Sequence, residues 1–311
     1  MQVFDRQATA AALPFDALIA ALRERFAAGC EVPPRHVHEI ADASGTGLTS
    51  LLMPAWVAGH CYGVKIINIA AGNAARGLPG LHASYLLFDA KTGVPLAMID
   101  GNELTARRTA AVSALAASWL ARRDAAHLLV VGAGRVARLL PAAYRAVRPI
   151  VRVSVWARRA AAARALALEL RREGFAADAV TDLAAAAAAA DITSCATLAN
   201  APLVHGAWLR PGSHLDLIGS FTPSMREADD ACFAGAALYV DTLEALAKSG
   251  DLLGPLARGV IAPADLRGTL ATLARGEAPG RSADDQRTVF KAVGTALADL
   301  AAAMLVCGRA G

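Results

Sequence analysis

The stretch His127-Leu128-Leu129-Val130-Val131-Gly132-Ala133-Gly134-Arg135-Val136-Ala137 decides the fold of this chain. It begins as an apolar strand, turns at two glycines and continues as the start of a helix. Gly132 permits the turn, and Gly134 lets the backbone approach a pyrophosphate on the helix N-terminus. The stretch therefore predicts a dinucleotide site at Gly132, Gly134, Arg135, Val136 and Ala137. A GxGxxA pattern alone is a weak signal, and a plain structural turn of an α/β domain is the alternative.

The next strand, Val151 to Trp156, ends in Ala157-Arg158-Arg159, which bears on the choice of cofactor. This position lies about 20 residues beyond the glycines, where NAD-binding domains place an acid on the ribose hydroxyls. Here two arginines stand instead, and a guanidinium pairs well with a 2′-phosphate. We therefore predict that Ala157, Arg158 and Arg159 contact the adenosine end and that NADPH is preferred, with NADH possible. A solvated helix start is the alternative for the arginines.

Strands and helices alternate beyond about residue 119, which is typical of a doubly wound parallel sheet. Two later strands end in Ser194-Cys195-Ala196-Thr197 and Leu217-Ile218-Gly219-Ser220. Ligands of open α/β sheets lie along the carboxyl edge, so Thr197 and Ser220 are candidate contacts of the nicotinamide. An ordinary role at a strand end is the alternative for each.

The preceding part of the chain has an antiparallel character. Strands are expected at 51–53, 62–69, 85–88 and 94–99, with a hairpin turn ending at Gly93. A helix from about 105 to 120 leads into the alternating region, and a last helix from Arg287 to Leu305 is expected to return to the first domain. We predict an α/β protein with a Rossmann domain at 119–286 and an α+β domain at 1–118, completed by 287–311.

Composition excludes several classes of protein. The chain has 311 residues, 55% hydrophobic and 19% charged, as in a globular protein. A net charge of +4 without a basic block interleaved with aromatics argues against nucleic acid as a partner. No apolar stretch is long enough to span a bilayer, and no signal peptide is apparent, so no membrane partner is expected. Five dispersed cysteines lack metal-ligand spacing and indicate reduced thiols in a cytoplasmic protein.

Charged residues in the first domain suggest a substrate site. Lys65 lies in an apolar, β-prone stretch, so its ammonium is expected in a partly buried space with an anionic partner. An edge-strand lysine that reaches solvent is the alternative. Arg107 and Arg108 begin the connecting helix, where neighbouring positions point about 100° apart. One arginine can face a cleft while the other is solvated, and a plain charged helix start is equally consistent.

Several segments together resemble the ornithine cyclodeaminase/mu-crystallin family. The most specific is Asp100-Gly101-Asn102 followed by Leu104-Thr105-Ala106-Arg107-Arg108-Thr109-Ala110-Ala111. The others are Met53-Pro54-Ala55, Gly63-Val64-Lys65, Gly132-Ala133-Gly134 and Thr288-Val289-Phe290-Lys291-Ala292-Val293-Gly294. The resemblance spans nearly the whole chain.

The resemblance implies a homodimer whose first domain forms both the dimer interface and the substrate site. Arg35, Lys65 and Arg108, here called the carboxylate clamp, match the family residues that hold the substrate α-carboxylate. Lys65 also matches a residue near the reacting nitrogen. Thr109 and His82 match positions close to the cofactor. The implied chemistry occurs at the Cα of a small amino or imino acid.

One departure from the family pattern separates the possible reactions. The cyclodeaminases and related alanine dehydrogenases carry an aspartate just after the strand-end glycine pair, whereas Gly219-Ser220 is followed here by Phe221. The segment is more similar to the ketimine and pyrroline-carboxylate reductases. We therefore expect an NAD(P)-dependent oxidoreductase that reduces cyclic ketimines or dehydrogenates amino acids. The alternatives are an ornithine cyclodeaminase and a non-enzymatic protein that binds NADPH and a small carboxylate ligand.

Overall fold

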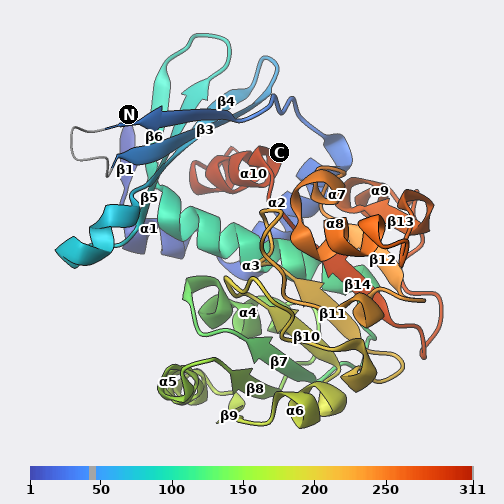
Figure 1. Ribbon diagram of the computed structural model, residues 1–311. Coiled ribbons are helices and arrows are strands. Elements are labelled where there is room, and N and C mark those ends of the chain that lie inside the picture. Colours follow the sequence, from blue (N-terminus) through green and yellow to red (C-terminus); the bar gives the residue numbers. More distant parts are fainter. Residues whose placement is uncertain (42–46, 310–311) are drawn as a thin grey trace. The chain divides into compact units, whose positions relative to one another are not determined.

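A computed structural model describes residues 1–41 and 47–309, and the chain forms two compact units (Figure 1). Unit 1 comprises Met1–Arg108 and Thr295–Gly311, and unit 2 comprises Thr109–Gly294. The division falls inside helix α3 (Gly101–Leu120) and after strand β14 (Thr288–Lys291). The sequence suggested boundaries at 118–119 and 286–287, and the second of these differs because β14 belongs to the sheet of unit 2.

Unit 1 is built on a six-stranded sheet in the order β1-β6-β5-β4-β3-β2, in which the β1–β6 pair is parallel and the others are antiparallel. Its strands are β1 (Gln2–Phe4), β2 (His36–Ile40), β3 (Leu48–Val57), β4 (Cys61–Ile69), β5 (Leu81–Asp89) and β6 (Pro95–Asp100). Its helices are α1 (Arg6–Ala12), α2 (Phe15–Ala28), the 3₁₀ turn η1 (Ala71–Arg76), the start of α3, and α10 (Ala296–Val306). Helix α10 packs on α2 and on β3, β4 and β5.

The register of β4 decides which side chains enter the core of unit 1. Cys61, Gly63 and Lys65 alternate with less buried residues, so the three share the buried face of the strand. The predicted hairpin after Asp89 is present, because the Asp89 carboxylate accepts hydrogen bonds from the Lys91 and Thr92 amides. Gly93 then adopts a φ of 72°.

Unit 2 is a Rossmann-type unit whose eight strands are all parallel, in the order β13-β12-β14-β11-β10-β7-β8-β9. The strands are β7 (His127–Val131), β8 (Arg152–Trp156), β9 (Ala176–Ala179), β10 (Ile192–Cys195), β11 (His214–Leu217), β12 (Ala237–Val240), β13 (Leu266–Thr269) and β14. The helices are α4 (Arg135–Arg145), α5 (Ala160–Arg172), α6 (Leu183–Ala189), α7 (Ala245–Lys248), α8 (Gly250–Ala257) and α9 (Leu270–Ala274). Short 3₁₀ turns are η2 (Gly206–Trp208), η3 (Asp230–Cys232) and η4 (Pro263–Asp265). The expected α/β class with a doubly wound parallel sheet is confirmed.

The C-terminal segment corrects one prediction. A single helix was expected from Arg287 to Leu305, but 288–291 form β14, which pairs with β11 and β12 in the middle of the sheet. The β-prone residues Thr288, Val289 and Phe290 are fully buried there, which favours a strand over a helix. The helix proper, α10, begins only at Ala296. It packs in unit 1, as expected of the returning helix.

Candidate active site

The turn after β7 has the shape that a dinucleotide requires. Gly132 has a φ of 125°, which L side chains rarely adopt, and its amide donates to the Trp156 carbonyl at 2.8 Å. A Cβ at this position would lie 2.7 Å from the Ala196 carbonyl oxygen. Only glycine therefore keeps β7, β8 and β10 in register at this turn.

The N-terminus of α4 is open toward solvent. Gly134 caps it without a side-chain hydrogen bond, and a Cβ on Gly134 would meet no atom within 4 Å. Arg135 is exposed and Val136 half-buried, while Ala137 is fully buried against the strand. The first amides of the helix therefore have room for an anion and a favourable dipole. A pyrophosphate fits this cradle.

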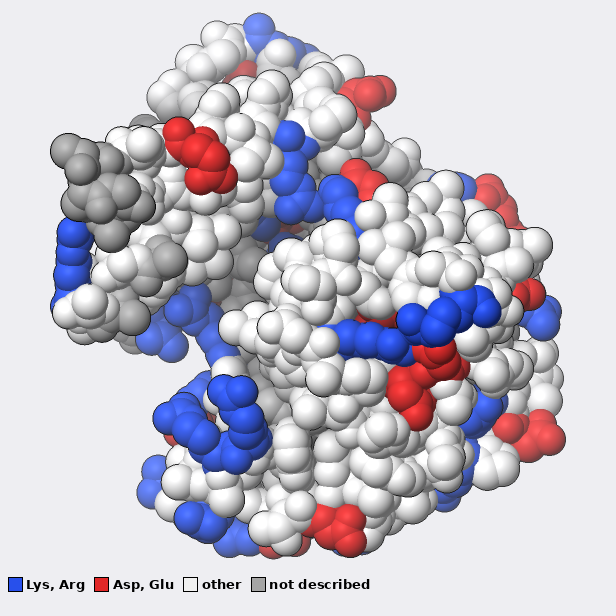
Figure 2. All heavy atoms as spheres, in the orientation of Figure 1, with Lys and Arg blue, Asp and Glu red and all other residues white. Residues whose placement is uncertain are grey.

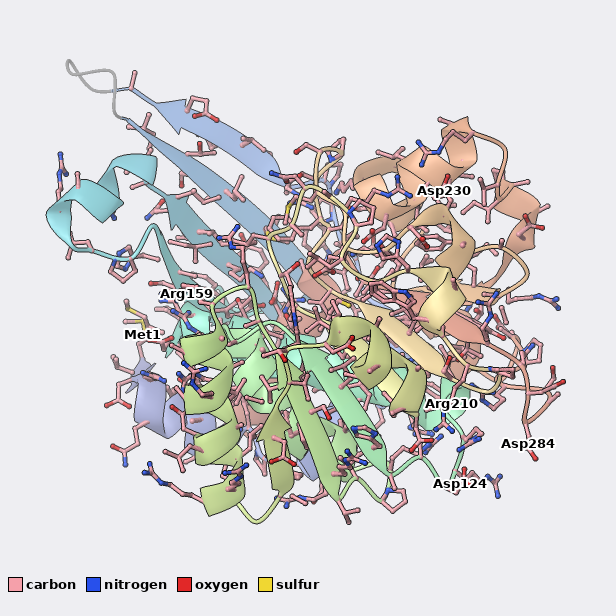
Figure 3. The ribbon with its side chains drawn as sticks, turned by 60° about the horizontal axis from the view of Figure 1, so that its bottom comes forward. Met1, Asp124, Arg159, Arg210, Asp230 and Asp284 are labelled. Atoms are coloured by element: carbon pink, nitrogen blue, oxygen red, sulfur yellow. The ribbon has the colours of Figure 1, made fainter. Side chains whose placement is uncertain are left out.

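The end of β8 carries positive charge and no acid. Ala157 is half-buried, while Arg158 and Arg159 are exposed, and neither arginine has an ion-pair partner among the described residues. Arg159 caps α5 with its backbone, and Figure 3 labels it at the loop that enters this helix. Figure 2 shows Lys and Arg side chains gathered over the α4–α5 part of unit 2. The surface beside the cradle suits a phosphate.

A buried glutamate ties together two strand ends at the same edge of the sheet. Glu227 Oε1 accepts from the Thr197 amide at 2.7 Å and from its hydroxyl at 2.8 Å, while Oε2 accepts from the Gly219 amide at 2.6 Å. Burial raises the pKa of Glu227 above its usual range, against the opposing charge of Lys291. Both carboxylate oxygens are thus occupied within the protein.

The two strand-end hydroxyls predicted to contact the cofactor have internal partners. The Thr197 hydroxyl donates a hydrogen bond to Glu227, and the Thr197 side chain is half-buried. Ser220 is fully buried, donates to the Met225 carbonyl at 2.5 Å and accepts from the Asp251 amide at 3.1 Å. Their predicted contact with the nicotinamide stays a prediction.

In unit 1 the structure brings Lys65 and Arg108 together on one carboxylate. Asp299 Oδ2 lies 2.6 Å from Lys65 Nζ, and Asp299 Oδ1 lies 2.8 Å from Arg108 Nε. The exposed fractions are 1% for Lys65, 6% for Arg108 and 0% for Asp299. These three residues are called the Asp299 cluster below. The edge-strand alternative for Lys65 is therefore wrong, because the ammonium has a buried anionic partner.

The surroundings of Lys65 lower the pKa of its ammonium below the usual value for lysine. Burial lowers the pKa of Lys65 to about 8, and the charges of Arg108 and Arg35 act in the same direction, while Asp299 opposes them. Arg35 is half-buried just before β2, close enough for its charge to be felt at Lys65. Lys65 and Arg108 thus share one carboxylate, and the charge of Arg35 acts on Lys65 without a direct contact that the structure records.

The motif Gly63-Val64-Lys65 has a packing reason. Tyr85 pairs with Lys65 across β4 and β5, and its ring lies over Gly63, where a Cβ would collide with it. The Tyr85 hydroxyl is buried and has no hydrogen-bond partner among the described residues. Burial, with the charge of Asp299 adding to it, raises the pKa of Tyr85 well above its usual range, so the phenol stays neutral.

Two predicted cofactor residues remain predictions. Thr109 is half-buried on α3 and is the first residue of unit 2. His82 is exposed on β5 in unit 1. The structure provides no observation that assigns either side chain to the cofactor.

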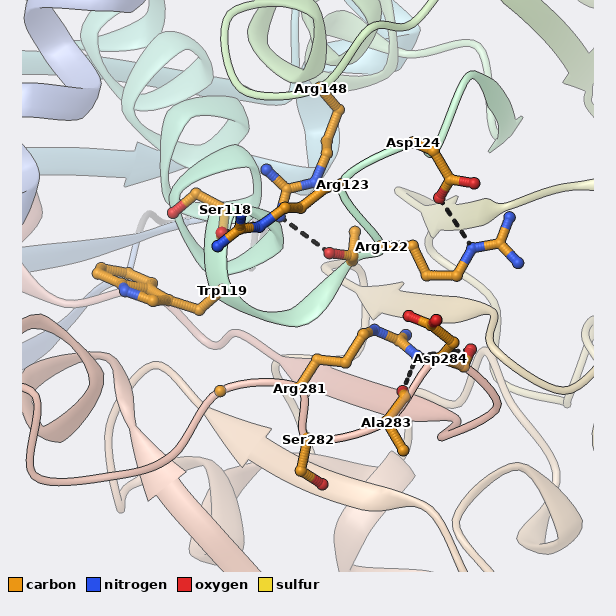
Figure 4. A pocket seen from close by; sticks show the side chains of 12 residues that line it. Ser118, Trp119, Arg122, Arg123, Asp124, Arg148, Arg281, Ser282, Ala283 and Asp284 are labelled. Atoms are coloured by element: carbon orange, nitrogen blue, oxygen red, sulfur yellow. Dashed lines mark hydrogen bonds and ion pairs between the residues drawn. The ribbon is translucent and has the colours of Figure 1, made fainter.

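A hollow of about 640 Å³ at the other edge of unit 2 is lined by arginines (Figure 4). Arg148 donates to the Ser118 and Ala121 carbonyls at 2.8 and 2.9 Å, and Arg281 donates to the Leu120 carbonyl at 2.8 Å. The guanidinium groups thus satisfy the last carbonyls of α3. Figure 3 places Asp124 and Asp284, from the rim of this hollow, across the unit from Arg159. This hollow stabilises a helix end and lies apart from the cofactor cradle.

Asp299 is the residue that sequence reasoning missed. It lies inside an alanine-rich helix, where an isolated acid predicts only a solvated turn. The sequence of α10 did contain an indication, because every other residue of this helix is apolar. A single carboxylate in an otherwise apolar helix must find a cation when the helix is buried.

Comparison with known proteins agrees with this geometry. The family model for ornithine cyclodeaminase/mu-crystallin proteins matches residues 6–311. The chain belongs to this family. The Delta(1)-pyrroline-2-carboxylate reductase of Paracoccus denitrificans is 46% identical over 281 residues, covering 89% of this chain and 88% of the relative.

Solved structures of similar proteins share the fold. The Delta(1)-pyrroline-2-carboxylate reductase of Thermococcus litoralis, in complex with NADH and L-proline, matches with a TM-score of 0.91 and 31% identity. The match covers 100% of this chain and 97% of that one. An archaeal alanine dehydrogenase dimer with bound NAD matches with a TM-score of 0.90 and 27% identity, over 100% and 96% of the two chains.

The protein is therefore an NAD(P)-dependent oxidoreductase of the ornithine cyclodeaminase/mu-crystallin type. The NADH and NAD in the solved relatives support a nicotinamide cofactor. Within residues 1–41 and 47–309, no group of three or more His, Cys, Asp or Glu side chains could hold a metal ion. In the same ranges, no helix combines the length and hydropathy needed to cross a membrane.

Proposed function

We propose that the protein reduces the C=N bond of a small cyclic α-imino acid, with Δ1-pyrroline-2-carboxylate as the first candidate substrate. The observation that carries this proposal is the Asp299 cluster, which presents two buried cations in a relative of pyrroline-carboxylate reductases. Two cations and one internal anion leave positive charge for a substrate carboxylate. Arg35 adds to that charge.

The chemistry follows from the charges of the clamp. Arg108 uses its Nε for Asp299, which leaves its terminal nitrogens to hold the substrate carboxylate in a fixed orientation. When bound, the nicotinamide cofactor supplies the hydride that forms the new C–H bond at Cα. The imine nitrogen must gain one proton, and the Lys65 ammonium, with a pKa of about 8, is suited to donate it near neutral pH. The product is the cyclic amino acid.

We further propose that NADPH is the preferred cofactor. Arg158 and Arg159 stand where an acid would bind the ribose hydroxyls, and both are exposed beside the α4 cradle. A 2′-phosphate would pair with either guanidinium. The two structural relatives described above contain NADH and NAD, so NADH remains the comparison to be measured.

A homodimer is proposed as the working assembly, with unit 1 as the interface. The archaeal alanine dehydrogenase relative is described as a dimer, and it matches this chain over its full length. Light scattering on the purified protein at several concentrations tests this, with twice the 32.0 kDa chain mass expected. A monomer at all concentrations would contradict it.

A substrate panel tests the proposed reaction. The purified protein is offered pyrroline-2-carboxylate, piperideine-2-carboxylate, pyruvate with ammonia, and ornithine, each with both cofactors in the matching redox state. We expect the two cyclic imines to be reduced most efficiently. Turnover of pyruvate with ammonia alone would indicate an amino-acid dehydrogenase. Cofactor binding without turnover of any compound would indicate a ligand-binding protein.

A further inference from the structure

Asp299 links three elements of unit 1 at a fully buried point. It lies in the first turn of α10, while Lys65 lies on β4 and Arg108 on α3. Each carboxylate oxygen takes one cation, Oδ2 the ammonium at 2.6 Å and Oδ1 the guanidinium at 2.8 Å. Such a bridge fixes the separation and orientation of both cations before any substrate arrives.

The charges would not keep this arrangement without the carboxylate. Burial penalises the ammonium of Lys65, and Arg108 and Arg35 repel it. Burial alone would also penalise Asp299, but Arg108 and Lys65 bring the pKa of its carboxyl below its usual range, so it stays ionised. A buried cation that loses its only counter-ion releases its proton or moves.

We propose that Asp299 is a positioning residue of the active site, which holds the Lys65 ammonium beside Arg108 and keeps it protonated for the reaction. This rests on the proposed function, because it assigns the protonated lysine a use in imine reduction. Asp299 itself has both oxygens turned to the two cations and acts on the substrate through them.

The groups around Lys65 determine the sign of the pH effect. Asp299 from α10 favours the ammonium, whereas Arg108 from α3 and Arg35 from the segment before β2 disfavour it. Tyr85 from β5 stays neutral. Removing the carboxylate takes away the negative charge that favours the ammonium and leaves burial, Arg108 and Arg35 to disfavour it, so we expect the pKa of Lys65 to fall below about 8. As the pH is raised, the variant should therefore lose its ammonium, and the activity that depends on it, at a lower pH than the native enzyme does.

The variant Asp299→Asn tests this through the pH profile of kcat/KM, which reports groups of the free enzyme. We expect the alkaline limb to move down by about one pH unit or more, where one unit is a tenfold change in the protonation equilibrium. The loss relative to the native enzyme is then large at about pH 8 and smaller at about pH 6. An equal loss at every pH would reduce Asp299 to a purely structural residue and overturn the proposal.

A matched control is Glu103→Gln, which neutralises another buried acid of unit 1. Glu103 pairs with Arg6 and Arg107, and not with Lys65. The alkaline limb of the kcat/KM profile of Glu103→Gln should lie at the same pH as that of the native enzyme. If Asp299→Asn does not fold, Asp299→Glu and Asp299→Ser make the same comparison, since the first keeps the carboxylate and the second removes it. The glutamate variant should keep the native limb.

A readout without substrate separates this proposal from the proposed function. The chain has four lysines, Lys65, Lys91, Lys248 and Lys291, so lysine labelled with ¹³C at Cε gives few NMR signals, and Lys65→Met assigns the relevant one. We expect this signal to titrate at lower pH in Asp299→Asn than in the native protein. Identical titration in both would overturn the proposal. An inactive native enzyme with a shifted titration would refute only the proposed reaction.

Discussion

Two neighbouring arginines on α3 have different surroundings. Arg107 pairs with Glu103 one turn earlier at 2.9 Å and is partly exposed, whereas Arg108 is buried on Asp299. Adjacent helical residues point about 100° apart, so only one of the pair can enter the core of unit 1. The sequence left open whether one arginine faces inward or both form a charged helix start, and in the structure Arg108 is the buried one.

Replacing Lys65 or Arg108 by Met should abolish imine reduction while NADPH binding stays near normal. Each change removes a charged contact to the substrate, which costs about 2–5 kcal/mol, or about 30-fold or more in kcat/KM. Steady-state kinetics and cofactor fluorescence titration measure the two effects. Arg107→Met is the control, because this arginine pairs with Glu103 and should keep most of the activity. Met variants of near-native efficiency would remove both residues from the clamp.

At the scale of elements, the β7–turn–α4 unit depends on one backbone conformation. Gly132→Ala places a Cβ at positive φ and within 2.7 Å of the Ala196 carbonyl oxygen. We expect weaker cofactor binding, by about tenfold or more, and a lower melting temperature, since strain of this kind costs about 1–3 kcal/mol. Gly174→Ala is the control, because Gly174 also has positive φ but no neighbour near its Cβ. Equal effects in both variants would show that the close approach is unimportant.

The proposed preference for NADPH rests on two arginines in the loop between β8 and α5. The double variant Arg158→Ala with Arg159→Ala should bind NADPH and NADH with similar affinity, because charge-assisted pairing with a phosphate contributes very roughly 1–3 kcal/mol. Dissociation constants for both cofactors, with and without the substitutions, measure this. Arg164→Ala, an exposed change further along α5, should leave the preference intact. The assignment fails if the native protein already binds both cofactors equally.

At the scale of the whole molecule, the available acids determine which reactions are possible. In ornithine cyclodeamination the distal amine is cationic at neutral pH, with a reference pKa of about 10.4, and a carboxylate is well suited to hold it and accept its proton. Phe221, 48% exposed, stands at the position where the family's cyclodeaminases place such a carboxylate. Glu227, the first acid after Phe221 along the chain, has both oxygens occupied by Thr197 and Gly219.

Ornithine should therefore be a poor substrate compared with cyclic imines, which carry no distal ammonium. Release of ammonia and formation of proline from ornithine with NAD⁺, measured beside imine reduction, checks this. The variant Phe221→Asp provides a sensitive comparison, since it restores the acid at an exposed position. Rates on ornithine that match or exceed imine reduction in the native protein would overturn the expectation.

Local patterns were sufficient for much of the fold. The strand, glycine turn and helix at 127–145 are specified by neighbouring residues, because a tight turn and a helix N-terminus depend on local backbone geometry. The hairpin after Asp89 is equally local, with hydrogen bonds that span three residues. Strand β2 was not predicted, because all its residues are exposed and its sequence lacks an apolar alternation.

Tertiary structure alone decided the parts that depend on distant partners. Residues 288–291 became a central strand because β11 and β12 flank them, a pairing that no local pattern encodes. Asp299 joined Lys65 and Arg108, which lie 234 and 191 positions away along the chain, since folding buried all three and a buried charge must find its counter-ion. The sequence by itself determined the chemical groups and the Rossmann turn. The contacts of Lys65 and Arg108 with Asp299 were decided by tertiary packing, which places α10 against β4 and brings Arg108 of α3 to the same carboxylate.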